Sequence, residues 1–222
     1  MCYSAESSIT SYLIGAPTSL YLLFFSKNKF HRYMGLVFFV VIQMQLLEYF
    51  IWIDQECTGY NQIASTLVPV ELSLQAISII YGAYIFNTLS LSKKTLFNIL
   101  IISCIVSLIY WSYNFYLRGK CTKKNINTNA LNWPSYTNGN NFALDFYLSI
   151  DENIFMILYF LVFLLPSLFL KDLNVNILYS GLGFLTLALN TYLFDRGSTF
   201  SRWCYYQSIF PSILVIKDIL KI

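Results

Sequence analysis

Carboxylate and carboxamide side chains recur inside otherwise apolar stretches of this chain, where their chemistry stands out. Gln45, Glu48 and Trp52 follow one another at three- and four-residue spacing, so they share one face of a helix. Glu71 and Gln75 repeat the pattern one turn apart. In a membrane helix a charged group costs about 2.5–3.5 kcal/mol on insertion scales, so such groups point to function. Two neighbouring carboxylates resist double ionisation, which suits binding of a proton, a cation or an amine.

Further polar positions fall toward the same side of the predicted bundle. Asn114 ends one apolar segment, Asn190 lies near the end of another, and Trp203 follows Arg202 at the start of the last. We expect an outward-facing pocket for a small solute or ion. Its candidate residues are Gln45, Glu48, Glu71, Gln75, Asn114, Asn190 and Trp203. The alternative, that these groups bond neighbouring helices or pair with Arg202 and only fix packing, stays open.

Several other chemistries do not fit the residues. The single histidine, His31, lies in a basic segment that we interpret as a solvated loop. A zinc hydrolase needs several His, Asp or Cys ligands. A retinal Schiff base needs a buried lysine, whereas Lys217 lies at a predicted helix end. We therefore predict no metal and no cofactor, and the net charge of +3 does not predict a nucleic-acid partner.

The composition predicts an integral membrane helix bundle. Of the 222 residues, 57% are hydrophobic and 11% are charged, against about 25% charged in soluble domains. A bilayer core needs roughly 20 apolar residues per helix. We predict an all-α, single transmembrane domain over 1–222 with about seven helices, at 9–25, 34–53, 63–87, 95–117, 153–170, 175–194 and 199–217. A long loop, 118–150, joins the fourth and fifth helices.

The distribution of lysine and arginine predicts the orientation. Basic residues at 27–32, at 93–94 and in the C-terminal tail fall on one side if the N-terminus is outside or lumenal and the C-terminus is cytosolic. The exception is the loop 118–150, which carries basic residues on the outer side, although charges far from helix ends count less. The lipid bilayer is the expected partner, and the sequence leaves the kind of membrane and the oligomeric state open.

Two cysteines fall on the predicted outer side. Cys57 follows the second helix and Cys121 lies in the long loop. An outer or lumenal compartment permits a disulfide between them. Two free thiols are the alternative, and the sequence does not decide between the two.

Proline positions suggest an internal repeat. The odd-numbered predicted helices contain Pro17, Pro69, Pro166 and Pro211. Aligning Glu48 with Asn190 also brings Pro69 onto Pro211, as a parallel 3+1+3 repeat would require. Repeats of this kind build some transporters. The layout resembles the small sugar and PQ-loop transporters, but the Pro-Gln pair of that group is absent from the sequence.

Three stretches carry a second resemblance that spans nearly the whole chain. They are MCYSAESS at 1–8, QMQLLEYFIW at 43–52 and GSTFSRWCYY at 197–206. They resemble an uncharacterised polytopic membrane-protein family opening Met-Cys-aromatic-Ser-Ala, found in large DNA viruses and protists. The positions matching its motifs are Cys2, Ser4, Glu6, Gln45, Glu48, Trp203 and Cys204. The resemblance implies no function. Under the predicted topology we expect Cys2 and Cys204 both near the outer face, either as a redox pair or as packing thiols.

Three function classes follow from these patterns. We expect a small binding or transport protein with an outward-facing polar pocket. The alternative is a structural or interaction protein of a viral or organelle membrane, whose buried polar groups specify helix packing. A third is a membrane-embedded enzyme acting on lipid through paired carboxylates or a cysteine. Replacing Glu48 by glutamine separates them, because only the first class loses flux or binding in a folded protein.

Overall fold

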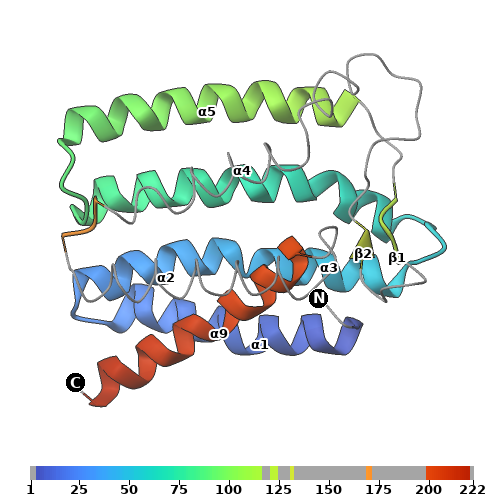
Figure 1. Ribbon diagram of the computed structural model, residues 1–222, viewed down its shortest axis with the longest axis horizontal. Coiled ribbons are helices and arrows are strands. Elements are labelled where there is room, and N and C mark those ends of the chain that lie inside the picture. Colours follow the sequence, from blue (N-terminus) through green and yellow to red (C-terminus); the bar gives the residue numbers. More distant parts are fainter. Residues whose placement is uncertain (1–3, 117–120, 125–130, 133–168, 172–198, 221–222) are drawn as a thin grey trace.

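The computed structural model describes residues 4–116, 121–124, 131–132, 169–171 and 199–220, and these are mostly helical (Figure 1). The described elements are α1 (Ala5–Phe25), α2 (Lys29–Val41), α3 (Gln43–Ile53), α4 (Tyr60–Phe86), α5 (Lys93–Tyr116), β1 (Lys123–Lys124), β2 (Leu131–Asn132) and α9 (Thr199–Leu220). The predicted helix 175–194 and most of the predicted helix 153–170 and of the loop 118–150 lie outside the described residues.

Within the described ranges, three helical segments are long and apolar enough to cross a membrane. They are Ala5–Phe25, Lys29–Ile53 and Tyr60–Phe86. Large apolar side chains also lie exposed on the outside of the bundle, as on α5, where Ile102 is 61% and Leu108 is 56% exposed. Water would not tolerate apolar surface on this scale, whereas lipid would. The fold is therefore compatible with a membrane protein.

The helices begin earlier than hydropathy predicts, because polar residues form their first turns. α1 begins at Ala5, where the Ser4 hydroxyl accepts a hydrogen bond from the Ser7 amide at 3.2 Å. α2 begins at Lys29, and the Asn28 side chain accepts from the Phe30 amide at 2.9 Å. The segment 27–32, interpreted from sequence as a loop, is thus largely the first helical turn of α2.

The predicted helix 34–53 is two helices in line. Ile42 separates α2 from α3, yet its backbone remains right-handed (φ −69°, ψ −19°) and its amide bonds to Phe38 at 2.9 Å. Lys29–Ile53 therefore forms one continuous segment, long and apolar enough to cross a membrane, with a local break at Ile42. The break lies three residues before Gln45.

The interpretation of His31 as a solvated loop residue is wrong. His31 is only 5% exposed, and its Nδ1 lies 2.7 Å from Asp218 Oδ1. The Ser26 hydroxyl donates to the same carboxylate oxygen at 2.7 Å. The physical reason is tertiary: the last turns of α9 pack across the junction of α1 and α2 and bury what would otherwise be an exposed helix start.

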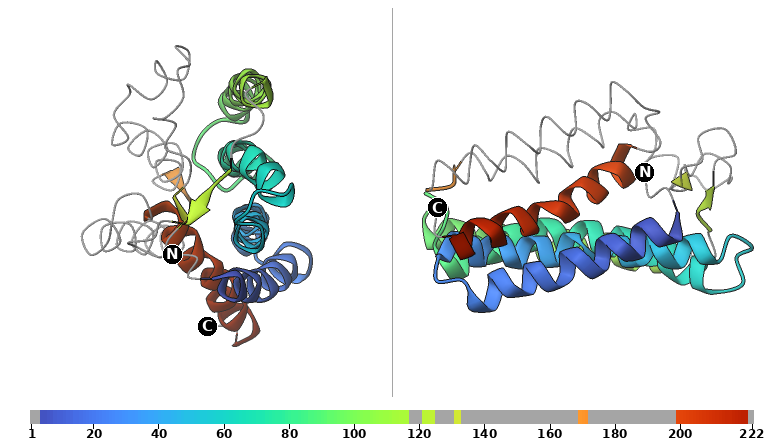
Figure 2. Two further views of the ribbon diagram at one scale, coloured as in Figure 1. Left: turned by 90° about the vertical axis from the view of Figure 1, so that its right-hand side faces the viewer. Right: turned by 90° about the horizontal axis from the view of Figure 1, so that it is seen from below.

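The helices α1, α2–α3, α4 and α5 lie side by side in an arc, and α9 crosses α1 and α2 on one side of it (Figure 2). Two glycines allow the closest approaches. A Cβ at Gly35 would lie 2.5 Å from the Leu23 amide nitrogen and 2.7 Å from the Ser19 carbonyl oxygen, so α1 and α2 touch backbone to backbone. A Cβ at Gly82 would lie 2.9 Å from the Tyr33 ring. Small residues at such contacts are typical of membrane helix packing.

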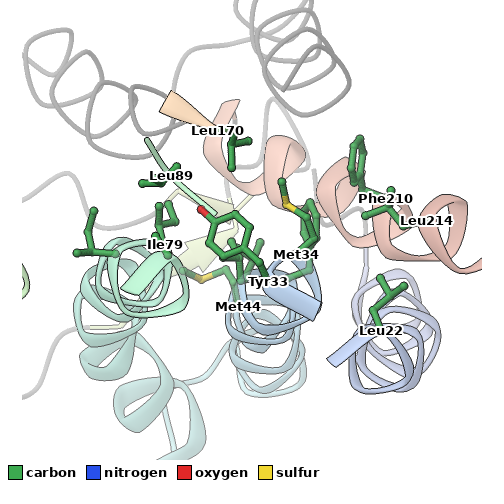
Figure 3. Packing of buried hydrophobic residues seen from close by; sticks show 14 of the residues in the cluster. Leu22, Tyr33, Met34, Met44, Ile79, Leu89, Leu170, Phe210 and Leu214 are labelled. Atoms are coloured by element: carbon green, nitrogen blue, oxygen red, sulfur yellow. The ribbon is translucent and has the colours of Figure 1, made fainter. Parts of the chain in front are cut away.

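The hydrophobic core lies on the concave side of this arc (Figure 3). It joins Leu22 of α1 and Met34 of α2 to Phe210 and Leu214 of α9, all buried. The rings of Phe38 and Phe210 are 5.1 Å apart. This core fixes α9 against α1 and α2, although the two segments are far apart in the sequence.

The two ends of the bundle differ in character (Figure 1). The end that we call the basic end holds residues 26–29, the turn 87–92, the segment 169–171 and the last turn of α9. There the Ser90 amide donates to the Phe169 carbonyl at 2.8 Å, and the Lys171 amide donates to the Thr88 carbonyl at 2.9 Å. The opposite end, called the disulfide end, holds the turn 54–59, β1 and the start of α1.

Candidate functional site

The carboxamide and the carboxylate of the α3 polar face are fully buried. Gln45 and Glu48 each have 0% exposure, and the Gln45 carboxamide donates to Glu48 Oε2 at 3.1 Å. One turn farther on, the Trp52 indole nitrogen is buried and has no hydrogen-bond partner within the described ranges. Buried donors in native proteins are nearly always paired, which makes this indole nitrogen stand out on α3. The face therefore presents a carboxylate and a donor at successive levels of one helix.

The α4 polar face has the same construction. Glu71 is 5% exposed and Gln75 is 0% exposed. The Gln75 carboxamide donates a hydrogen bond to Glu71 Oε1 at 3.4 Å. Both belong to a buried stripe along α4 that recurs every three or four residues. Its polar members are Asn61, Ser65, Glu71, Gln75 and Ser78. A stripe this polar on a helix this apolar is unusual, since buried polar groups stabilise only when they are paired.

The two glutamates lie on neighbouring helices at staggered depths. Glu48 is six residues before the end of the span at Asp54, about 9 Å at 1.5 Å per residue. Glu71 is eleven residues after Tyr60, about 17 Å from the same end. A shallow groove between α3 and α4 is lined by Gln43, Leu46, Leu47, Leu67, Val70 and Glu71. Within the described ranges, Glu71 thus shares its groove with Gln43, and Glu48 lies on a different face of α3.

The other predicted site residues are only partly visible. Asn114 lies in α5 and Trp203 in α9, but only their backbones are described, and Asn190 lies outside the described residues. Cys2 also lies outside them, and only the backbone of Cys204 is described. The structure therefore brings Gln45 to Glu48 and Glu71 to Gln75, and whether the remaining residues join them stays a prediction.

Cys57 and Cys121 form a disulfide at the disulfide end, with their Cα atoms 6.0 Å apart. The sequence left open whether these two cysteines are bonded or are free thiols, and the structure contains the disulfide. It links the turn after α3 to the segment after α5 across 64 residues of sequence. The third described cysteine, Cys104, is free and partly buried on α5.

Sequence reasoning missed the most extensively bonded residue at this end, Asn61. Its buried carboxamide donates to the carbonyls of Thr122 and Asp54, both at 2.9 Å, and to that of Ile51 at 3.3 Å. Its oxygen accepts from the Thr122 amide at 2.9 Å and from the Ser65 hydroxyl at 2.9 Å. Asn61 thereby anchors the segment that follows α5, at the start of the long loop, onto α4. Only its place in the first turn of a helix, where asparagine side chains often bond locally, signals such a role.

Asp54 supplies the acceptor that the start of α4 lacks. Gly59, at the N-cap position with φ of 150°, has no side chain to cap the helix. The Asp54 carboxylate accepts instead from the amides of Thr58 at 2.8 Å, Gly59 at 3.0 Å and Asn61 at 2.9 Å. This carboxyl lies in the turn between α3 and α4. The hydrogen bonds from the Asn61 and Thr58 amides stabilise its ionised form and lower its pKa to about 2.

The stability of the protein should therefore depend on acid through Asp54. Its folded pKa of about 2 is below the ordinary 3.8, so the ionised form favours the folded state. That contribution is complete above about pH 4 and is lost as the pH falls toward 2. We expect Asp54→Asn to melt at a lower temperature than the wild type at pH 6, with the difference shrinking between pH 4 and pH 2.

Thermal unfolding in detergent from pH 2 to pH 6 measures this difference. Glu56→Gln, the same chemical change at an exposed position two residues on, is the matched control and should follow the wild type. A pH-independent gap between Asp54→Asn and wild type would contradict the assignment.

The described ranges contain no group of three His, Cys, Asp or Glu side chains able to hold a metal ion. Each of the two carboxylates accepts a hydrogen bond from a carboxamide on its own helix, and a carboxylate held in this way can take up a proton or bind a cation. No protein-family model, no curated protein and no solved structure matches this chain.

Proposed function

We propose that this chain is a multi-pass membrane protein that binds and transports a small solute or ion through a polar pocket open to the outside. The observation that carries the proposal is the pair of buried carboxylate–carboxamide couples, Glu48 with Gln45 and Glu71 with Gln75, on adjacent apolar helices. Functional sites are where a membrane protein accepts the cost of such groups.

The proposed topology has about seven spans, arranged as a 3+1+3 parallel repeat. Its support is the alternation of ends in the described part of the chain: residues 26–29, 87–92 and 169–171 and the last turn of α9 meet at one end, while 54–59 and 121–124 meet at the other. The disulfide lies at the end opposite the lysines and arginines of 27–32, 93–94, 171 and 217, although Lys123 and Lys124 lie at the disulfide end. This distribution supports an outer or lumenal N-terminus and a cytosolic C-terminus.

In this proposal the two carboxylates act in sequence. A carboxylate in apolar surroundings needs a proton, a cation or a hydrogen-bond donor to offset its charge. Gln45 donates to Glu48 and Gln75 donates to Glu71, and in this proposal a proton, a cation or an amine binds at the same carboxylates. The stagger of about 8 Å along the helix axis places Glu48 nearer the disulfide end, so an incoming solute meets Glu48 before Glu71.

The structural or interaction protein is the second candidate. Its support is that each carboxylate already accepts a hydrogen bond from its own helix, which is enough to specify packing. Under that alternative the glutamates set helix rotation and carry no solute.

Currents recorded from the full chain in liposomes on a supported membrane, across pH and ion gradients, separate the two. We expect Glu48→Gln to remove the current, because glutamine keeps the size of the side chain and one acceptor oxygen for Gln45 but cannot exchange a proton or pair with a cation. Glu6→Gln, at an exposed position in α1, is the matched control and should leave the current intact.

An undiminished current in folded Glu48→Gln would remove Glu48 from the pathway. Absence of current in both proteins, with a pH-sensitive dye inside the liposomes also silent, would favour the structural candidate.

A further inference from the structure

The basic end gathers positive charge from four separate parts of the chain. Its described cations are Lys27, Lys29, Arg32, Lys93, Lys94, Lys171 and Lys217. All but Lys217 are exposed. Among the described residues the acid at this end is Asp218; Asp172 lies outside them. The turns and helix ends that carry these cations lie together in Figure 1.

Asp218 does not neutralise this surface. Its Oδ1 is occupied by His31 Nδ1 and by the Ser26 hydroxyl, both at 2.7 Å, and its side chain is only 16% exposed. The fold thus turns the acid toward the interior and leaves the lysines outside. Within the described ranges, none of the seven cations forms an ion pair.

Several of these cations instead contact aromatic rings or neutral oxygen atoms, which do not cancel the positive charge. The Arg32 guanidinium lies 5.3 Å from the centre of the Phe86 ring, and its Nε donates to the Leu23 carbonyl at 3.0 Å. Lys93 lies 5.9 Å from the Tyr84 ring. Both rings belong to the last turn of α4, with Arg32 approaching from α2 and Lys93 from α5. An aromatic ring or a carbonyl attracts a cation without cancelling it.

Lys171 extends the row. Its ammonium group contacts the Asn87 carbonyl at 3.3 Å and the Asn87 side-chain oxygen at 3.0 Å, which fixes it beside the turn after α4. The result is an exposed row of cations interleaved with aromatic rings at the ends of apolar helices. In a bilayer this is the level of the headgroups, where aromatic residues concentrate and phosphate groups lie.

We propose that the basic end binds the headgroups of anionic phospholipids, with phosphate seated over the last turn of α4 between Arg32 and Lys93. Charge complementarity and depth together favour lipid: the row follows the rim of membrane-crossing helices, where headgroup phosphates lie. Headgroup binding requires that the chain is inserted in a membrane but not that it transports a solute. Its test is therefore independent of the role of Glu48.

Lipid retention by the full chain in nanodiscs tests the proposal. Discs are made from phosphatidylcholine and phosphatidylserine in a four-to-one ratio, and native mass spectrometry counts the lipids that remain on the protein. We expect the wild type to retain phosphatidylserine in excess of its share. Arg32→Gln/Lys93→Gln should lower this excess by at least about fivefold, since each cation near the surface contributes roughly that factor.

Lys123→Gln/Lys124→Gln removes the same charge from the disulfide end, where both lysines are exposed, and should leave the excess unchanged. Lys93→Gln/Lys94→Gln, at two exposed positions that open α5, provides a second variant if the change at Arg32 disturbs packing. Equal retention by all variants, or equal losses at both ends, would overturn the proposal. Displacement of the retained lipid by inorganic phosphate alone would overturn lipid as the occupant.

Discussion

Replacing Asn61 by leucine is expected to destabilise the protein by about 3–5 kcal/mol, because several buried polar groups lose their partner at roughly 1–3 kcal/mol each. The carboxamide of this fully buried residue bonds three carbonyls, one amide and one hydroxyl. Leucine fills similar space and offers none of these bonds. The Thr122 carbonyl would lose the donor supplied by Asn61, so the segment 121–124 should detach from α4.

Equilibrium unfolding in mixed micelles measures the loss. Gln62→Leu makes the same kind of polar-to-apolar change at the next position of α4, where the side chain is half-buried, and should cost much less. If Asn61→Leu unfolds with the same midpoint as Gln62→Leu, the network does not anchor the segment in solution.

Hydropathy predicts where the described helices run, because a bilayer demands long apolar stretches. It fails at their ends, where polar residues continue the helix. α1 extends back to Ala5 and α2 to Lys29, since serine and asparagine side chains cap both starts. The apolar pattern also runs without interruption through Ile42, so it carries no sign of the break between α2 and α3.

Burial of polar residues depends on partners far away in the sequence. His31 and Asp218 are 187 positions apart, and no local pattern links them. Asn61 and Thr122 are likewise joined across 61 positions. Such pairs depend on how helices pack, whereas sequence spacing reports only on one helix at a time.

In the candidate site too, contacts within one helix follow from the sequence, whereas contacts between helices do not. Spacing within α3 predicts that Gln45 and Glu48 share a face, and the structure joins them at 3.1 Å. The relation of Glu48 to Glu71 depends instead on how α4 is rotated against α3. Gln43 lines the groove beside Glu71 and Glu48 does not, so the spacing within one helix could not predict which residues share that groove.

Loss of the disulfide is the other large effect that we expect. Replacing both Cys57 and Cys121 by serine should lower the free energy of unfolding by about 2–4 kcal/mol, because the bond closes a long loop in the unfolded chain. The entropy account alone gives about 4 kcal/mol for a separation of 64 residues. The measured value should be lower, because α4 and α5 stay helical in lipid or detergent and leave the unfolded loop fewer conformations to lose.

Unfolding with and without reductant measures this contribution and also tests the topology. The wild type in reductant should match the double serine variant, and Cys104→Ser should match the oxidised wild type. In intact cells, a membrane-impermeant reductant should open the bond if the disulfide end is extracellular, but should spare it if that end faces an organelle lumen. A bond that is already reduced in freshly isolated membranes would place this end in the cytosol, which would reverse the proposed orientation and put the basic end on the opposite side.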